Sequence, residues 1–162
     1  MMENEFFWMA RNGALPDGFD QWELADQNGR TVAHEAAKYG NLPDGFGKWL
    51  MADKRGWTVA HECAYAGHFP TGFDAWSAED RFGDTVAHIA AYNGVLPAGF
   101  DQWQWSDQYG WSVAHAAAKT GNLPADFDQW ELSTRDGWTV RREFASREKK
   151  LKFSVIGTCA KE

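Results

Sequence analysis

The chain has 162 residues, a formal net charge of −7, and a composition that is 44% hydrophobic and 15% aromatic. This length suits one domain with a sizeable core. The chain has no continuous run of about 18 apolar residues, so we expect no membrane span. The acidic N-terminus lacks the basic flank of a signal peptide. The charge is uneven, because residues 1–140 hold 9 bases and 20 acids whereas residues 141–162 hold 7 bases and 3 acids. We expect an acidic body with a basic C-terminal segment.

One motif returns along the chain every 27 residues. Its centre is Thr31-Val32-Ala33-His34, and Thr or Ser stands at the same place at 58, 85, 112 and 139. All five prolines and five of the ten tryptophans keep the same interval. A fixed period between about 20 and 50 residues is typical of a stacked array, in which each repeat buries its apolar face against its neighbours.

The interval divides the chain into one repeat domain that covers residues 1–162. Residues 1–25 are a degenerate half-repeat expected to close one end of the stack. The full repeats are residues 26–52, 53–79, 80–106 and 107–133. In the last copy polar residues replace the small residues and the histidine, which predicts a capping helix over 134–152 and a tail over 153–162.

Each full repeat begins with a tight turn followed by a helix. In the first one, Asp26-x-x-Gly29 has the composition of a turn whose last position needs a permissive backbone. Thr31 is expected to cap the helix, with His34 reaching back in a variant of the capping box. Gly40 is expected to end the helix.

The second half of the repeat is predicted to form another, shorter helix. Leu42 and Pro43 are followed by Phe46 and Trp49. Proline fits the first turn of a helix, and aromatic residues three apart share a helix face. Gly45 within the segment favours one or two turns, of 3₁₀ type.

These motifs resemble ankyrin repeats. The family's turn Asp-x-x-Gly-x, followed by Thr-Pro-Leu-His-x-Ala-Ala-x-x-Gly, is matched by the run from Asp53 to Gly67 and by the other repeats, over about residues 4–145. Val-Ala replaces Pro-Leu throughout, and the repeat is shorter than the family's usual length of about 33 residues. The resemblance implies an all-α solenoid of stacked helix-turn-helix units that binds partners and needs no cofactor.

The residues that could support catalysis have structural roles in this pattern. Histidines at 34, 61, 88 and 115 lie on neighbouring helices about 8–10 Å apart, too far for two of them to bind one zinc at about 2.1 Å. The recurrent turn aspartates are expected to accept backbone N–H groups. No nucleophile elbow or phosphate-binding loop is present. We expect no enzyme activity, no metal and no cofactor.

The two cysteines form no metal-binding or redox spacing. Cys63 stands where other repeats have Ala36, Ala90 and Ala117, which predicts a small buried thiol. A reducing compartment fits this usage, and we expect a cytoplasmic protein.

The resemblance also implies a partner-binding surface. In ankyrin-like repeats, two positions after the turn Asp, the position before Thr, and two positions before the helix-ending Gly usually face the concave partner side. This set holds seven of the nine bases of residues 1–140, all four tyrosines and three tryptophans outside the Phe-x-x-Trp register, but only two acids, Asp84 and Asp136. The candidates are Arg30, Lys38, Lys54, Arg55, Trp57, Tyr65, Arg81, Phe82, Tyr92, Tyr109, Trp111, Lys119 and Trp138.

Three functions remain open. The first is a monomeric, non-catalytic module that binds another protein, because aromatic residues and Arg dominate interface hot spots. The second is nucleic-acid binding through interleaved bases and aromatics, which the net charge disfavours. The third is inhibition, in which an acidic outer face mimics nucleic acid in the basic channel of an enzyme.

Overall fold

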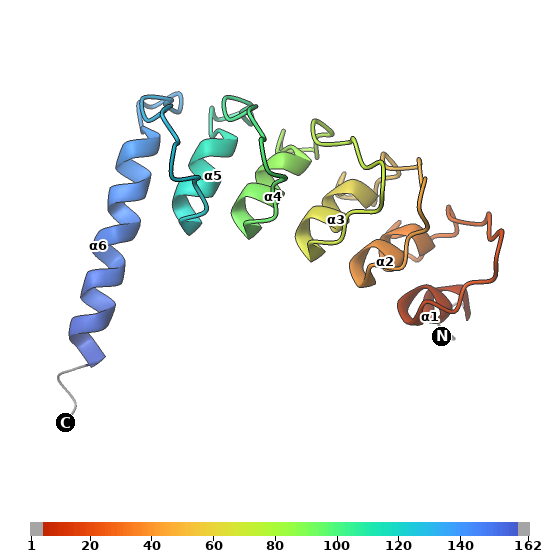
Figure 1. The fold of residues 1–162 in the computed structure, drawn as a ribbon. Helices are drawn as coiled ribbons and strands as arrows, with labels where there is room; N and C mark the ends of the chain where they lie inside the picture. Colours follow the sequence, from red (N-terminus) through yellow and green to blue (C-terminus); the bar gives the residue numbers. More distant parts are fainter. Residues whose placement is uncertain (1–4, 159–162) are drawn as a thin grey trace. The chain divides into compact units, whose positions relative to one another are not determined.

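The structure, a computed structural model, describes residues 5–158, with side chains for residues 5–151. The chain forms two compact units that divide between Ile89 and Ala90. The described residues contain six helices and no strand (Figure 1): α1 (Glu5–Asn12), α2 (Val32–Tyr39), α3 (Val59–Ala66), α4 (Val86–Asn93), α5 (Val113–Thr120) and α6 (Val140–Thr158). The predicted all-α repeat solenoid is confirmed.

Helices pack side by side within each unit because their sequences supply small residues. In the first unit α2 lies between α1 and α3, and in the second α5 packs against α6. Val32, Ala33 and Ala36 of α2 have no exposed surface. The predicted helix limits are confirmed for α2, which starts after Thr31 and ends at Gly40 in the left-handed conformation.

The second helix of each repeat was predicted wrongly. The segment with Pro43, Phe46 and Trp49 forms two successive turns, and the Phe46 N–H donates to the Pro43 carbonyl at 3.2 Å. Gly45 has φ +72°, a left-handed conformation that stops helix growth. Each full repeat therefore contains one helix, and the helix-turn-helix part of the predicted architecture does not hold.

The C-terminal helix also differs from its predicted range of 134–152. It starts at Val140 and continues to Thr158, so residues 153–158 of the expected tail are helical. Residues 159–162, including Cys159, lie outside the described residues. The other predicted repeat boundaries, and the assignment of one domain to the whole chain, stay predictions.

Aromatic ladders take the place of the missing second helices. In the first unit, Phe19, Trp22, Phe46 and Trp49 pack edge-to-face with ring centres 5.0–5.4 Å apart. In the second, the ladder runs from Phe100 to Trp103, Phe127, Trp130 and Phe144 with spacings of 5.1–5.5 Å. Such pairs stabilise a fold by about 0.5–1.5 kcal/mol each beyond burial. Within each unit they hold successive repeats together on the side away from the Asp-x-x-Gly turns.

The turns follow the predicted chemistry. The Asp53 carboxylate accepts the N–H groups of Arg55 at 2.8 Å and Trp57 at 3.0 Å. The N–H of Lys54, in the same turn, donates to the carbonyl of Asn28 in the preceding turn at 3.0 Å. This turn is thus fixed internally and also bonded to its neighbour, and the Arg135 N–H donates to the Tyr109 carbonyl at 3.1 Å in the same way in the second unit.

The histidines cap helices and link repeats. The Thr31 hydroxyl accepts the His34 N–H, and His34 Nδ1 accepts the Thr31 N–H at 3.1 Å. Because a carbonyl can only accept, His34 Nε2 carries the proton and donates to the Trp57 carbonyl at 3.0 Å. His61 bonds to the Asp84 carbonyl in the same way. The expected capping role is confirmed.

Burial lowers the pKa of His34 and His61 below 6.5, because desolvation disfavours the charged ring. The unfolded chain therefore takes up protons first as the pH falls. The resulting stability is complete above pH 6.5 and is lost as the pH falls through the lower pKa of the folded state.

We predict that the free energy of unfolding decreases between pH 7.5 and pH 5.5, as measured by urea denaturation with tryptophan fluorescence. The double variant His34→Gln/His61→Gln should have a smaller pH dependence than the wild type, because two of the buried capping rings are removed. His68→Gln, outside the capping register, should keep the pH dependence of the wild type. An unchanged pH dependence in the double variant would contradict the role given to these two rings.

A second prediction concerns Gly56, which has φ +81° and lies where a Cβ would come 2.9 Å from the Arg81 nitrogen. Gly72 has a similar φ of +85° with nothing within 4 Å. Gly72→Ala should cost roughly 1–2 kcal/mol for the left-handed backbone alone, and Gly56→Ala clearly more, since a backbone atom must move. Urea midpoints of the two variants give the comparison, and equal losses would mean that the turn contact is unimportant.

Candidate functional site

Two grooves lie between the turns and the helices, one in each unit. The first groove, in the first unit, is lined by Arg30, Lys38, Asp53, Arg55, Trp57, Glu62, Tyr65, Asp80 and Phe82. The second groove, in the second unit, is lined by Tyr109, Trp111, Thr134, Arg135, Asp136, Trp138 and Glu143. We call the surface that the turn tips and the adjoining helix side form in each unit the inner face.

The grooves bring together nine of the thirteen predicted binding residues. Six line the first groove and three the second. The remaining four are Lys54, Arg81, Tyr92 and Lys119. Lys54 donates to the Gln27 carbonyl at 2.7 Å, and Arg81 lies 4.6 Å from the centre of the Phe82 ring. The role of all thirteen in binding stays a prediction.

Trp57 forms the wall of the first groove. Its backbone is fixed by Asp53, and its ring lies 5.0 Å from that of His61 and 6.5 Å from that of Tyr65. Its indole N–H donates to Glu62 Oε2 at 2.9 Å. The tryptophan is therefore fixed before any partner binds, which reduces the entropy cost of binding.

An ion-pair network lies beside this wall. Arg30 contacts Glu62 at 3.3 Å and Glu35 at 3.9 Å, and Arg11 contacts Glu35 at 2.9 Å. Glu35 and Glu62 are 7% and 5% exposed. Removing an arginine from such a pair leaves a buried charge without compensation, which is strongly destabilising. Part of the basic charge predicted for the inner face is thus neutralised within the protein.

These acids were not predicted from the sequence. Only Asp84 and Asp136 were found among the inner-face positions. The helix position five residues after the residue that precedes the capping Thr was not included in that set. Trp57 with Glu62 and Trp138 with Glu143 share this spacing. In the second pair the Trp138 indole also donates to Glu143 Oε2 at 2.9 Å. A repeated Trp-x-x-x-x-Glu spacing was the available signal.

The exposed large hydrophobic side chains gather on the inner face. Eight such residues occur in the described part of the chain, and six are at its turn or helix positions: Trp8, Tyr39, Tyr65, Phe82, Tyr92 and Tyr109. The other two are Leu50 and Leu151. Trp8 was not predicted, although it stands one repeat interval before Glu35 and so occupies the same helix position.

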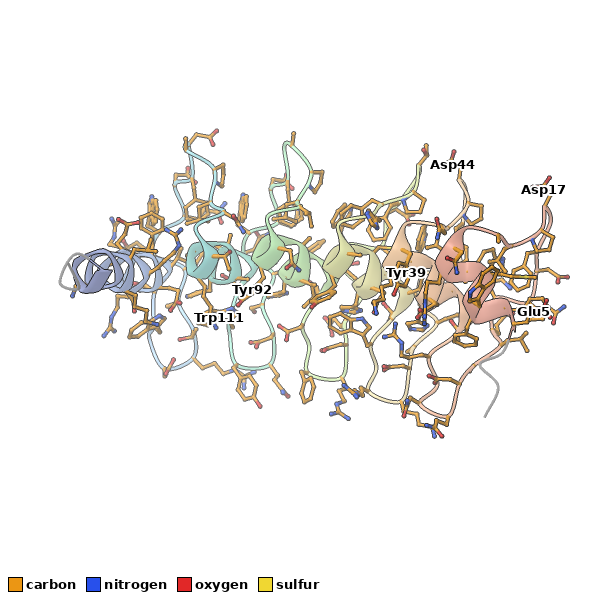
Figure 2. The ribbon with its side chains drawn as sticks, turned by 90° about the horizontal axis from the view of Figure 1, so that it is seen from below. Glu5, Asp17, Tyr39, Asp44, Tyr92 and Trp111 are labelled. Carbon is orange, nitrogen blue, oxygen red and sulfur yellow. The ribbon has the colours of Figure 1, made fainter. Side chains whose placement is uncertain are left out.

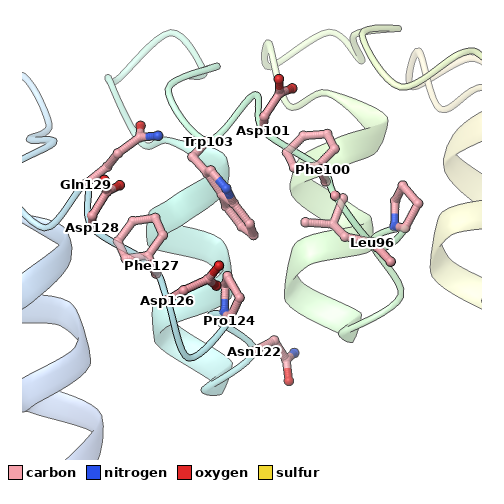
Figure 3. Close-up of a pocket in the computed structure, with 13 residues that line it drawn as sticks. Leu96, Phe100, Asp101, Trp103, Asn122, Pro124, Asp126, Phe127, Asp128 and Gln129 are labelled. Atoms are coloured by element: carbon pink, nitrogen blue, oxygen red, sulfur yellow. The ribbon is translucent and has the colours of Figure 1, made fainter.

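The opposite side of the repeats carries acids. In the first unit Asp17 and Asp44 lie at loop tips, away from Tyr39 at the end of α2 (Figure 2). In the second unit an outer groove holds the exposed carboxylates Asp101, Asp126 and Asp128 beside Trp103 and Phe127 (Figure 3). This groove lies along the aromatic ladder.

The titratable groups elsewhere have structural surroundings. Burial raises the pKa of the Cys63 thiol to about 12, which keeps it protonated and unreactive. Within the described residues no three His, Cys, Asp or Glu side chains are placed to hold a metal ion. No helix in residues 5–158 combines the length and apolar content needed to cross a bilayer.

Comparison with known proteins identifies the fold. No family model and no curated protein sequence matches the chain. The ankyrin repeat domain of Bcl-3, described as a unique member of the IkappaB protein family, matches with a TM-score of 0.63 and 16% identity, over 90% of this chain and 81% of that one. An ankyrin repeat domain from Acinetobacter baumannii AYE matches with a TM-score of 0.63 and 17% identity, over 90% and 92%. The chain therefore has the fold of an ankyrin repeat domain, built from shortened repeats.

Proposed function

We propose that the chain is a protein-binding module that holds its partner on the inner face. The observation that supports this most strongly is that six of eight exposed large hydrophobic side chains lie there. Scattered exposed apolar residues are ordinary, but their concentration on the same face of each unit is typical of an interaction site.

The chemistry of the grooves fits a protein partner. Trp and Tyr are enriched in interface hot spots, and Trp57 and Trp138 are each held by a carboxylate at 2.9 Å. In each unit two neighbouring turn tips are bonded to each other, Lys54 to Asn28 and Arg135 to Tyr109, so this surface is largely formed in advance. The fold is compatible with this function but does not by itself identify a partner.

Nucleic-acid binding by the same face is less well supported. Arg11 and Arg30 pair with Glu35 and Glu62, so these arginines are not available as phosphate contacts. The carboxylates of Asp53, Glu62 and Asp80, which line the first groove, would also repel a phosphate backbone.

Loss of two exposed aromatics should weaken partner binding. Tyr65 and Phe82 are 63% and 46% exposed, whereas Leu50, 70% exposed, lies off the inner face. We predict that Tyr65→Ala/Phe82→Ala reduces partner recovery about tenfold or more, as expected for hot-spot residues, and that Leu50→Ala leaves it unchanged. Affinity capture with the full chain, with and without nuclease, followed by mass spectrometry measures this. Full recovery by the double variant, or loss of all partners with nuclease, would refute the proposal.

A second candidate function is inhibition by an acidic surface that occupies a basic site of a nucleic-acid-processing enzyme. The observation that favours it is the outer groove, where Asp101, Asp126 and Asp128 are brought together in one unit. A regular set of carboxylates can follow the charge pattern of phosphates and is attracted to basic channels.

The outer groove has its own test. Asp101→Asn/Asp126→Asn/Asp128→Asn keeps side-chain size and removes three charges. If the outer groove is the working surface, this variant should lose its partner while Tyr65→Ala/Phe82→Ala retains it. The inner-face proposal predicts the reverse in the same capture experiment.

A further inference from the structure

The two grooves are built from equivalent repeat positions. Trp111 precedes Glu143 by the same number of residues as Arg30 precedes Glu62. This separation is one repeat interval plus the distance along the chain from Trp57 to Glu62 or from Trp138 to Glu143. In both grooves an indole N–H donates to the carboxylate at 2.9 Å, from Trp57 to Glu62 and from Trp138 to Glu143. The carboxylates are therefore presented in the same way.

The first groove supplies its own cation. The Arg30 guanidinium, from the neighbouring repeat, lies 3.3 Å from Glu62 Oε2, the oxygen that also accepts the Trp57 indole. This carboxylate is already paired, so a charged group from outside would have to displace Arg30. The arrangement also shows that a carboxylate at this helix position can bind a guanidinium group.

The second groove has Trp111 in place of Arg30. Glu143 is half-buried, accepts the Trp138 indole, and makes no ion pair with any described residue. A partly desolvated carboxylate gains most from a charged donor, because such hydrogen bonds are about twice as strong as neutral ones. The carboxylate of Asp136 lines the same groove, and a hydrogen bond from the Thr134 hydroxyl lowers its pKa and keeps it ionised.

The tryptophans of the second groove also favour a cation. Lys119 Nζ lies 5.6 Å from the centre of the Trp111 ring, and Arg142 Cζ lies 4.7 Å from that of Trp138. Both distances are within the range of cation–π attraction. Neither of these bases, nor Arg135 at the edge of the groove, forms an ion pair with Glu143 in the described structure.

We propose that the second groove binds an arginine side chain of the protein partner, with its guanidinium on Glu143 and against the rings of Trp111 and Trp138. This inference rests on the proposed function and names the side chain that the inner face recognises. Arginine suits the site better than lysine, because its planar fork bonds a carboxylate with two N–H groups and stacks on aromatic rings.

The test uses the full chain labelled with ¹⁵N and follows its tryptophan indole N–H signals by NMR. The probe is the peptide acetyl-Gly-Arg-Gly-amide, and the matched control is the same peptide with citrulline, which has the arginine shape without the charge. We expect the Arg peptide to shift the Trp138 indole signal saturably. The citrulline peptide should bind at least about fivefold more weakly, since it lacks a charge-assisted hydrogen bond.

Three variants make the test specific. Glu143→Gln should abolish the difference between the two peptides. Trp111→Arg should close the second groove by supplying an internal cation, as Arg30 does in the first. Arg30→Gln should open the first groove, so that the Trp57 indole, silent in the wild type, begins to respond to the Arg peptide.

The inference is overturned if the Trp138 signal does not move, if both peptides shift it equally, or if Glu143→Gln leaves the difference intact. The dispersion of the remaining indole signals shows whether each variant is folded. Because partner capture by Tyr65 and Phe82 is measured separately, failure of the arginine site would leave the protein-binding proposal standing.

Discussion

The hydrogen bond from a capping histidine to the next turn determines most of this structure. His34 uses one ring nitrogen to cap its own helix and the other to hold the Trp57 carbonyl at 3.0 Å. His61 and His115 do the same toward Asp84 and Trp138. Because the ring is buried, each of these bonds lies in a low-dielectric environment, where losing it would leave unsatisfied polar groups. The position of each turn tip, and hence of the inner face, depends on this bond.

The shortened repeat changes what stabilises the stack. An ordinary helix pair would bury two helical faces, but here the second face is an aromatic ladder carried by turns. The Trp49 carbonyl accepts the Ala60 N–H at 3.1 Å and the Met51 carbonyl accepts the Val59 N–H at 3.0 Å. The ladder segment thus satisfies the first N–H groups of the helix, which would otherwise lack partners. The same residues supply both packing and capping, so a second helix is not required.

The sequence was sufficient to predict features that depend on nearby residues. The turn aspartates, the helix caps and the end of α2 at Gly40 involve groups close together along the chain, and they were predicted correctly. The second helix was predicted wrongly because the spacing of Pro43, Phe46 and Trp49 is also that of a helix face, and Gly45 was taken as compatible with a short helix. The positive φ of Gly45 is incompatible with a continued helix.

The charge of the inner face could not be predicted for a related reason. Arg30 was identified as a binding residue, but its partner Glu62 lies in the following repeat, and only the turn stacking brings them to 3.3 Å. A residue type at a face position therefore does not give the charge that a partner meets. The repeat fold determines where each side chain lies, and the sequence of the neighbouring repeat determines whether that side chain is already in an ion pair. Where Arg30 is replaced by Trp111, the same frame presents a carboxylate and an aromatic wall, so one repeat can differ from the next in what it recognises without any change in fold.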